Sequence, residues 1–428
     1  MVTKKPVPHG YKQTEVGVIP QDWQVDNLER FWVVTDCKHI TAEFVSNGIP
    51  VASIREVQSY FVELKNAKQT TELYYLELIE GGRKPQPGDL IFSRNATVGE
   101  VAQVCEWHPP FAMDQDVCLL RKKDPNFSSD YLQAVIRSPI VIEQLANLMV
   151  GSTFKRVNVE QIRNLTVPMP LPEEQRVIAQ SLSDVDALIT ECDRLITKKR
   201  HIKQGTMQQL LTGKKRLPGF SGEWEVKKLG GECELITKGT TPTSLGKRFK
   251  NNGINFIKAE SLEENGDVII DKIAFIDYET HSLLKRSQLQ ENDILVSIAR
   301  VLGRTAMVKK ELLPANTNQA LAIARLRESG KITHIYIFYY LKSSLIRKQI
   351  DFINVQAAQA NLSWENINDL IIYFPSLPEP KAIAQILSDM DAEIAALEQK
   401  RDKYNNIKHA MMQELLTGKI RLKNNSAD

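Results

Sequence analysis

The chain has 428 residues, of which 42% are hydrophobic and 25% are charged, and its formal net charge is +3 with a pI near 8.4. Chains longer than about 250–300 residues usually divide into domains. No apolar run approaches the roughly 18–20 residues of a membrane helix, and the N-terminus lacks the apolar region of a signal peptide. Five cysteines without a C-x-x-C pair indicate reduced thiols and a cytoplasmic protein. The mild basicity permits nucleic-acid binding but does not by itself argue for it.

The first 170 residues are expected to form a mixed α/β domain. Four short apolar segments have strand character, at residues 51–54, 90–92, 101–104 and 117–120. Residues 130–148 are predicted to be helical, and Pro139 must kink or divide this helix because proline lacks the amide that a helix interior needs. A loop and a short strand at residues 165–167 complete the domain.

A long helix is predicted from about residue 173 to residue 212. It follows a cluster of prolines and ends at Thr212-Gly213, which is a good C-cap. Apolar residues recur with the 4-3-4-3-4 spacing that is typical of a coiled-coil seam. They are Ile178, Leu182, Val185, Ile189, Cys192 and Ile196. Basic residues at 198–200 interrupt the pattern, so looser pairing is expected beyond Ile196.

The second half of the chain repeats the first. Residues 178–187 read IAQSLSDVDA and residues 383–392 read IAQILSDMDA, and both segments run on to a near-identical close. The offset of about 205 residues is far longer than the 20–50 residues of solenoid repeats, so a whole domain with its helix is duplicated. The second copy is expected to contain a helix at 333–350 and a short strand at 370–373. Its seam consists of Ile383, Leu387, Met390, Ile394 and Leu397.

Two matching seams in one chain favour packing of the two helices on each other, and the pseudo-two-fold relation requires them to be antiparallel. The alternative is that each helix packs only on its own domain. The expected fold class is α/β (α+β), with two pseudo-symmetric mixed α/β domains joined by two long antiparallel coiled-coil helices. The expected boundaries are 1–170 for the first domain, 171–213 for the first helix, 214–376 for the second domain, and 377–428 for the second helix and tail.

Isolated residues also match between the two domains. Asp89, Gln115 and Arg121 correspond to Asp293, Gln319 and Arg325. Between such anchors the two halves differ strongly. The shared residues are therefore interpreted as fold, and the divergent remainder as the place where the two halves bind different things.

No catalytic motif is found in the sequence. An N-P-P-Y/F/W run for a flipped base and a G-x-G-x-x-G loop for a dinucleotide are both absent. Residues 239–248 resemble a P-loop, but the glycines are too far apart and Arg248 stands where a serine or threonine belongs. The seven histidines show no metal spacing with each other or with cysteine. The chain is therefore expected to be non-catalytic and to hold no metal.

Polar, basic loops occur at equivalent places in both halves. Arginine and lysine reach phosphates or guanine, asparagine and glutamine pair with adenine, and serine and threonine bridge to either. One such loop is more often an ordinary solvated turn, but recurrence of the set favours DNA binding by the group. The candidates are Lys38, His39, Thr41, Arg94, Asn95, Gln115, Thr153, Lys155 and Arg156 in the first half, and Lys238, Thr240, Thr241, Arg300, Asn318, Gln319 and Gln356 in the second.

The chain resembles the specificity subunits of type I restriction-modification systems. The resemblance rests on GST at residues 151–153, PLPEEQRVIA at 170–179, QQLLTGKKRLPGF at 208–220 and YKQTEVGVIPQDW at 11–23. It covers essentially the whole chain, in the order of the family. One departure is that the second copy reads Pro380-Lys381 where the first reads Glu174-Gln175-Arg176, one residue shorter.

The resemblance implies two target-recognition domains, each reading one half of a bipartite, asymmetric double-stranded DNA target. The helices would set the gap between the half-sites and bind two modification (methyltransferase) subunits. Those subunits would carry S-adenosylmethionine and methylate adenine, so this chain needs no cofactor, and a restriction subunit that translocates and cleaves DNA would join them. No membrane partner is implied.

Partner contacts are expected on the two helices. The aspartate pairs there are two residues apart and do not share a helix face, so a capping or partner-facing role is favoured over acid–base catalysis. The expected contacts are Gln175, Arg176, Asp184, Asp186, Gln385, Asp389 and Asp391. Two other functions stay open: a specificity subunit of another methyltransferase-based defence system, and a coiled-coil adaptor without sequence-specific DNA binding.

Overall fold

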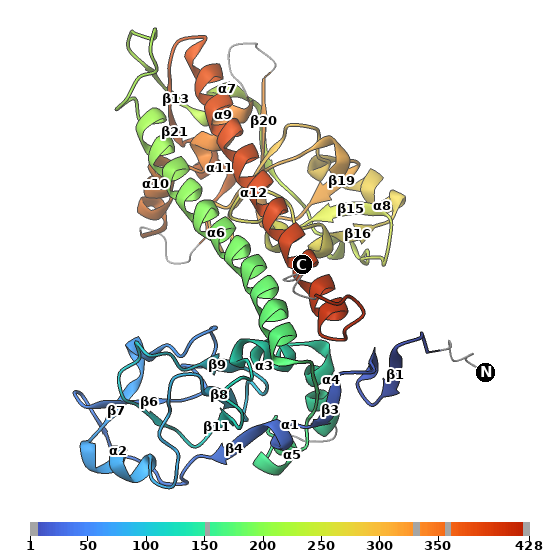
Figure 1. Ribbon diagram of the computed structural model, residues 1–428. Helices are drawn as coiled ribbons and strands as arrows, with labels where there is room; N and C mark the ends of the chain where they lie inside the picture. Colours follow the sequence, from blue (N-terminus) through green and yellow to red (C-terminus); the bar gives the residue numbers. More distant parts are fainter. Residues whose placement is uncertain (1–6, 150–154, 328–333, 356–360, 423–428) are drawn as a thin grey trace. The chain divides into compact units, whose positions relative to one another are not determined.

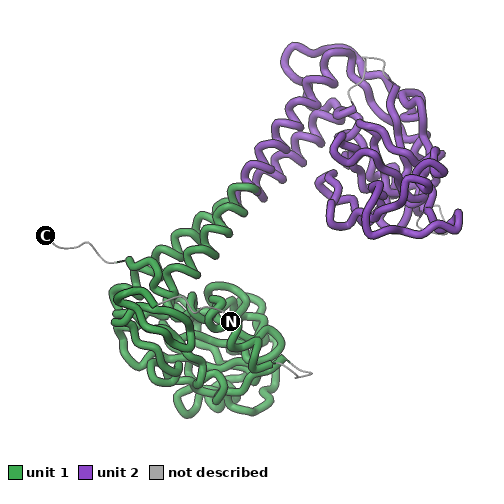
Figure 2. Tube along the Cα trace, turned by 90° about the vertical axis from the view of Figure 1, so that its right-hand side faces the viewer, with its two compact units in different colours: residues 1–193, 399–428 green, residues 194–398 purple. Residues whose placement is uncertain are grey.

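The computed structural model describes residues 7–149, 155–327, 334–355 and 361–422 (Figure 1). The chain divides into two compact units (Figure 2). Unit 1 comprises residues 1–193 and 399–428, and unit 2 comprises residues 194–398. Unit 1 is thus built from two separate stretches of sequence, whereas unit 2 is continuous. Among the described helices, none has the length and apolar character needed to cross a membrane.

Unit 1 is centred on a four-stranded antiparallel sheet with the order β4-β11-β8-β9. These strands span Trp32–Asp36, Val117–Lys122, Leu90–Ser93 and Val101–Gln103. A second sheet has the order β10-β6-β7-β5, with strands at Ala112–Met113, Ile49–Ala52, Lys68–Thr70 and Phe44–Val45. Two further pairs join β1 (Tyr11–Thr14) to β2 (Gly17–Pro20) and β3 (Gln24–Asn27) to β12 (Thr166–Met169). The helices are α1 (Leu28–Phe31), α2 (Glu72–Leu78), α3 (Ser129–Ile136), α4 (Pro139–Leu148) and α5 (Val159–Arg163).

The central sheet of unit 1 is buried on both faces. Successive side chains of a strand point to opposite faces, and β11 follows this rule. Cys118 and Leu120 pack in a core with Tyr131 of α3, whereas Val117 and Leu119 pack in a separate core next to the second sheet. This double burial explains why β11 reads as a continuous apolar run rather than as an alternating one.

Unit 2 repeats this plan. Its central antiparallel sheet has the order β14-β20-β17-β18, with strands at Cys233–Lys238, Leu321–Leu326, Ile294–Ser297 and Thr305–Met307. A three-stranded sheet joins β16 (Ala274–Ile276), β15 (Ile254–Ile257) and β19 (Ala315–Thr317), and β13 (Glu225–Lys228) pairs with β21 (Ile371–Phe374). The helices are α7 (Leu229–Glu232), α8 (Tyr278–Leu283), α9 (His334–Leu341), α10 (Ser344–Val355) and α11 (Trp364–Asn368). The predicted mixed α/β class and the internal duplication are confirmed.

The predicted helices before the long helices are each divided in two. Pro139 occupies the first turn of α4 and separates it from α3, as its missing amide predicts. In unit 2 the single helix expected at 333–350 is also interrupted, between α9 and α10. No proline marks this second break, so the sequence pattern did not reveal it.

One ion pair occurs at the same place in both units. The buried carboxylate of Asp89 accepts hydrogen bonds from Nε and Nη2 of Arg121, at 2.9 and 2.6 Å. Asp293 accepts the same two bonds from Arg325, both at 2.7 Å. Two parallel bonds of this kind fix orientation as well as distance. The aspartate and arginine that match between the two copies therefore have a structural role, because they link neighbouring strands of the central sheet in each unit.

Two long helices complete the units, α6 (Pro172–Leu210, 39 residues) and α12 (Glu379–Leu415, 37 residues). In unit 1, Lys408 pairs with Asp186 at 2.6 Å and Arg401 with Asp193 at 3.5 Å. In unit 2, α6 and α12 are joined by the pairs Lys199–Glu393 (2.5 Å), Arg200–Glu398 (2.6 Å) and Lys203–Asp391. Numbers rise on one helix as they fall on the other, so the predicted antiparallel pairing is confirmed.

The seam between the helices has both an apolar and a polar part. Ile178, Leu182 and Ile383 are buried, but they also belong to the cores of their own units, so the helices pack on the domains as well as on each other. Beyond Ile196, where looser pairing is expected, the kind of contact between the helices changes. The basic residues there meet acidic residues of α12, and ion pairs continue the contact where the apolar seam ends.

Each helix is followed by an arginine that binds a glutamate at the start of the other helix. In unit 1, Arg421 contacts both carboxylate oxygens of Glu174 at 2.6 and 2.8 Å. In unit 2, Arg216 contacts those of Glu379 at 2.8 and 2.6 Å. Glu379 is therefore the counterpart of Glu174. The shorter start of the second helix is confirmed. Pro378 precedes Ile383 by five residues, whereas Pro172 precedes Ile178 by six. Helix α12 begins at Glu379, whereas α6 begins two residues before Glu174, at Pro172.

The turn that leads to Arg421 requires glycine. Gly418 has a φ of +67°, and a Cβ there would lie 2.4 Å from a ring atom of Pro20. Gly213, its counterpart, has a φ of +68°, but its added Cβ would approach nothing closer than 3.5 Å. The left-handed conformation alone costs an L-residue about 1–2 kcal/mol.

We expect Gly213→Ala to lower the free energy of unfolding by about that amount, and Gly418→Ala to lower it clearly further, because Pro20 or the turn must move. Urea denaturation followed by circular dichroism measures both variants. Equal losses in the two variants would show that the close approach to Pro20 has no energetic weight.

Candidate nucleic-acid interface

Three loops of unit 1 meet at one edge of the central sheet. Strand β4 ends at Asp36, β8 ends at Ser93, and β11 begins at Val117. Because β4 and β8 both run antiparallel to β11, these three ends lie at the same edge. The loops at residues 36–41, 93–97 and 114–116 are called loop set 1 below. The corresponding loops of unit 2, at residues 238–241, 297–300 and 318–319, are called loop set 2.

A threonine–glutamine pair occurs in both loop sets. The Nε2 of Gln115 donates to Oγ1 of Thr41 at 3.2 Å. In unit 2, Oγ1 of Thr241 donates to the Oε1 of Gln319. All four side chains are at least partly exposed. The structure therefore brings together predicted residues that are far apart in sequence, and it does so twice with the same chemistry.

Arg94 lies beneath loop set 1 rather than on its surface. Its side chain is only 4% exposed, and Nη1 pairs with Asp36 at 2.9 Å. Nη2 donates to the carbonyl of Gln115 at 2.7 Å and to Sγ of Cys37 at 3.4 Å. This placement revises the expectation of a base contact. With its donors used within the protein, Arg94 ties the three loops together.

The neighbours of Arg94 form a set of metal-type ligands that the sequence spacing did not suggest. Ligand atoms of Asp36, Cys37 and His39 all lie within 4.8 Å of one another. However, the Arg94 guanidinium already binds two of these residues, so a cation would meet a positive charge. Burial raises the pKa of Cys37 to about 12, and metal binding needs the thiolate. The set therefore does not suit a metal ion.

The remaining candidates of unit 1 divide between paired and exposed side chains. Lys38 pairs with Glu80, and Asn95 donates to Asp116 at 2.9 Å, so both are engaged within the fold. His39 is exposed at the edge of the loop set, with its Nε2 3.2 Å from Asp36. Lys155 and Arg156 are exposed, and a β-bridge between Asn95 and Arg156 holds them beside loop set 1. Thr153 lies outside the described residues.

Arg300 of loop set 2 has a strongly exposed side chain. It is 85% exposed, and the nearest paired carboxylate, that of Glu260, is 3.9 Å away. Its φ of +65° matches the +57° of Ala96 at the tip of the corresponding turn in unit 1. Left-handed backbone is uncommon outside glycine, and where it persists it often marks a functional site. Arg300 is thus presented to solvent by a turn that exists in both units.

The other predicted residues of unit 2 surround this turn. Lys238 is exposed at the end of β14, and the Oδ1 of Asn318 accepts a bond from the amide of Ala320 at 3.2 Å. Thr240 accepts a hydrogen bond at 3.0 Å from Arg286, an exposed arginine that the sequence did not single out. Its segment lies between α8 and β17, as residues 79–89 lie between α2 and β8 in unit 1, where Arg83 donates to the carbonyl of Asp36 at 2.9 Å. Gln356 lies outside the described residues.

The predicted partner contacts on the helices separate into two groups. Gln175 is fully buried, accepts from the amide of Ser128 at 3.0 Å, and donates to the carbonyl of Pro170 at 2.9 Å. Asp186 and Asp391 face the opposing helix and pair with Lys408 and Lys203. These three positions revise the expectation of a partner-facing role, because their polar groups are used within the units.

Four of the predicted contacts remain on the helix surface: Arg176, Asp184, Gln385 and Asp389. Gln180 donates to Asp184 at 2.7 Å, and Gln385 donates to Asp389 at 2.8 Å. The same exposed glutamine–aspartate pair therefore stands at the same place on both helices. Such a repeated surface feature is suited to two equivalent partners.

Two relatives of this chain are named as specificity subunits of type I restriction enzymes. A relative from Methanocaldococcus jannaschii, whose name assigns it to the MjaX type I restriction enzyme as a specificity subunit, is 27% identical and covers 96% of this chain and 97% of its own. The EcoBI specificity subunit of Escherichia coli is 21% identical and covers 87% and 80%.

Solved structures share the fold. A chain from a study of complex assembly in a type I R-M system matches with a TM-score of 0.58, at 18% identity, over 94% of this chain and 99% of its own. The S subunit from M. genitalium matches with a TM-score of 0.57, at 13% identity, over 92% and 96%.

A family model settles the relationship. The type I restriction modification DNA specificity domain matches twice, at residues 16–200 and 221–408, one match for each copy of the repeat. The chain belongs to the family of type I restriction-modification DNA specificity subunits.

Proposed function

We propose that this chain reads a bipartite, asymmetric double-stranded DNA target, with loop set 1 and loop set 2 each reading one half. The observation that carries this proposal is the repeated threonine–glutamine pair, Thr41–Gln115 and Thr241–Gln319, at the same sheet edge of both units. Glutamine can form two hydrogen bonds with an adenine edge, one donated by its amide nitrogen and one accepted by its amide oxygen, and threonine can bond a base or a phosphate. The strands that carry the loops have the same arrangement in both units. The loops differ in sequence, so the two halves of the target differ too.

The basic side chains beside these loops serve the DNA backbone. Lys155 and Arg156 in unit 1, and Lys238, Arg286 and Arg300 in unit 2, are exposed. Phosphate contacts position a protein on the duplex but carry no sequence information. Arg94 acts indirectly, because it holds the three loops of set 1 in place.

In this proposal the chain itself is not an enzyme. Two modification subunits bind the helices at the repeated surface that includes Arg176, Asp184, Gln385 and Asp389, and they supply S-adenosylmethionine and adenine methylation. A restriction subunit joins the complex. The proposal is supported by the names of the relatives, which are specificity subunits of type I restriction enzymes, and by the presence of one such surface on each helix.

Replacing the recognition domain of one unit tests this function. Residues 28–165, which lie between β3 and β12, would be replaced by the corresponding residues of a relative, leaving the Arg421–Glu174 contact and both helices unchanged. Because loop set 1 lies within the exchanged residues and loop set 2 does not, one defined segment of the methylated target should change and the other should stay. Methylome sequencing of a host that expresses the variant with its partner subunits measures both segments.

The matched control exchanges residues 229–370 in unit 2, which should change the other segment only. A change of both segments in either variant would show that the units do not read independently. The chain alone, incubated with DNA and labelled S-adenosylmethionine, should transfer no methyl group. Incorporation without partners would overturn the non-catalytic assignment.

A further inference from the structure

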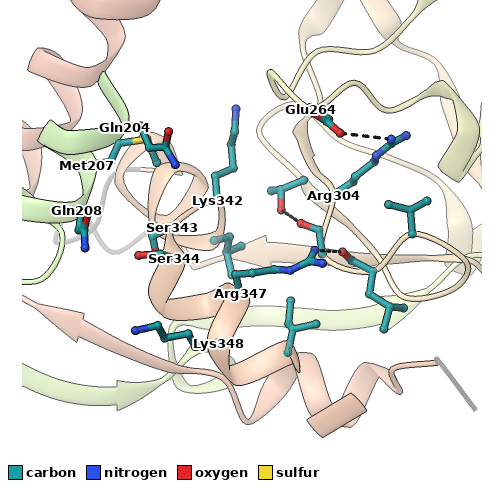
Figure 3. A pocket seen from close by; sticks show the side chains of 16 residues that line it. Gln204, Met207, Gln208, Glu264, Arg304, Lys342, Ser343, Ser344, Arg347 and Lys348 are labelled. Carbon is teal, nitrogen blue, oxygen red and sulfur yellow. Dashed lines mark hydrogen bonds and ion pairs between the residues drawn. The ribbon is translucent and has the colours of Figure 1, made fainter. Parts of the chain in front are cut away.

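Unit 2 contains a half-open pocket of about 540 Å³ beside the turn that carries Arg300 (Figure 3). Its walls are the last turns of α6, the turn between β17 and β18, and the start of α10. Binding sites for small molecules commonly have volumes of about 300–1,000 Å³. All the lining residues belong to unit 2. The pocket is large enough for a molecule well beyond a single ion.

Basic side chains outnumber acidic ones around the pocket, although Arg347 also pairs with Asp351 at 3.2 Å and Lys342 donates to the carbonyl of Asn265. Arg304, Lys342, Arg347 and Lys348 line it, and Glu264 is the one carboxylate among the lining residues. That carboxylate lies 3.8 Å from Arg304 and is largely exposed, so it screens the arginine only weakly (Figure 3). Burial, and then the charge of nearby Lys203, lower the pKa of Lys342 to about 8. A lowered lysine pKa means that the positive charge there is not fully compensated.

Two buried polar groups of the lining residues have no hydrogen-bond partner among the described residues. Ser343 is only 5% exposed, and its hydroxyl oxygen makes no hydrogen bond with any described residue. The Nε of Arg304 is likewise buried without an acceptor among the described residues. Ser343 directly precedes α10, a helix of 12 residues whose N-terminal end lines the pocket. The free amides and dipole of a helix N-terminus favour a bound anion.

The same place in unit 1 carries less positive charge and no unpaired hydroxyl, although the Nε of Arg137 is also buried without an acceptor among the described residues. The counterparts of Arg304, Arg347 and Lys348 are Glu100, Ile142 and Glu143. Arg137, the counterpart of Lys342, donates to the carbonyls of Ser59 and Val101 at 2.9 and 2.8 Å. Ser138, the counterpart of Ser343, donates to the carbonyl of Val135 at 2.6 Å. The shared fold therefore requires neither the positive charge nor the unpaired hydroxyl of unit 2.

We propose that this pocket of unit 2 binds a phosphorylated small molecule of mononucleotide size, with Arg304, Arg347, Lys348 and the Ser343 hydroxyl on its phosphates. Arginine and lysine are the side chains that recognise phosphate groups. The apolar part of the wall, which includes Met207, Leu341 and Ile350, suits the rest of the ligand. The phosphates of a DNA duplex do not fit, because the Ser343 hydroxyl is too deeply buried for a duplex backbone to reach.

Calorimetric titration of the full-length chain at constant ionic strength tests the proposal with ATP, inorganic phosphate and adenosine as probes. ATP should bind more tightly than phosphate, and adenosine should not bind measurably. The variant Arg304→Glu with Lys348→Glu should weaken ATP binding at least tenfold. The control variant Lys285→Glu with Lys310→Glu changes the net charge equally at exposed lysines that do not line the pocket, and it should bind ATP as the unchanged chain does.

Ser343→Ala separates binding from folding. It removes a buried hydroxyl that has no acceptor, so the thermal stability of the chain without ATP should be unchanged or higher, whereas ATP affinity should fall several-fold. Equal ATP binding by the pocket variant and the control, or no ATP binding at millimolar concentration, would overturn the proposal. Equally tight binding of phosphate and ATP would overturn the assignment to a mononucleotide-sized ligand. These outcomes do not depend on DNA reading, so they are distinct from failure of the proposed function.

Discussion

Replacing Arg94 with alanine should collapse loop set 1 and abolish reading of one half of the DNA target, although Arg94 itself touches no base in this arrangement. The change removes the buried arginine that pairs with Asp36, which keeps its contact with His39, and it removes two donors to the carbonyl of Gln115. Breaking a buried charge pair typically costs about 3–5 kcal/mol, and the partial exposure of Asp36 reduces this to about 2–4 kcal/mol. Urea denaturation of the chain and DNA binding of the assembled complex measure the two effects.

Arg300→Ala is the matched comparison. Its side chain is exposed, so the free energy of unfolding should change by less than about 0.5 kcal/mol. If Arg300 contacts a base edge, specificity at one target position should relax by about 1–3 kcal/mol. If it contacts only a phosphate, binding should weaken for all sequences alike, with a shallower salt dependence. Loss of specificity in Arg94→Ala without loss of stability would instead restore Arg94 as a direct reader.

Lengthening both long helices by one turn should widen the unspecified gap in the target. One turn adds about 5.4 Å, and a base pair occupies about 3.4 Å along the duplex, so the gap should grow by one to two base pairs. Both defined segments should keep their sequence. Methylome sequencing of the variant with its partners measures the spacing directly.

The insertion must be made in both helices, because ion pairs join them on either side of the point where the chain passes between units. We would insert four helix-forming residues after Asp193 and four after Glu398. Both members of the pair Arg401–Asp193 then stay on one side of the two insertions, and both members of the pair Arg200–Glu398 stay on the other side. Insertion into α6 alone should shift one set of pairs against the other and reduce activity. An active double-insertion variant that still methylates the original spacing would show that the helices do not set the gap.

The fold could be predicted from the sequence to the extent that it depends on periodic patterns. The two seams, the break at Pro139 and the mixed α/β class each follow from apolar spacing or from proline chemistry. The break between α9 and α10 has no such local signal. The ion pairs beyond Ile196 were not predicted either. A basic residue within a seam can pair with the other helix only if an acidic residue lies opposite, and the sequence alone does not show which residues lie opposite.

The candidate site was predictable as a set of loops but not as a geometry. The correspondence of Gln115 and Gln319 was visible in the repeat, and the structure adds their threonine partners. The burial of Arg94 and Gln175 was not visible, because exposure depends on residues far away in sequence, such as Asp36 and Ser128. Arg286 was missed because its contact with Thr240 joins segments that are 46 residues apart in the sequence. Polar residues in a loop can hold the loop together as easily as they can bind a ligand.

The contact between Arg421 and Glu174 has a consequence for the order in which the units form during synthesis. Unit 2, residues 194–398, is complete as soon as Glu398 has left the ribosome, whereas unit 1 still lacks residues 399–422. Those residues supply Met412, Leu415 and Leu416 to its core, and Arg421 to Glu174 and Asp22. The half of the chain that is translated first is therefore finished last. A product truncated after residue 398 would keep a complete second unit and an unfinished first one, so it could not read the whole target.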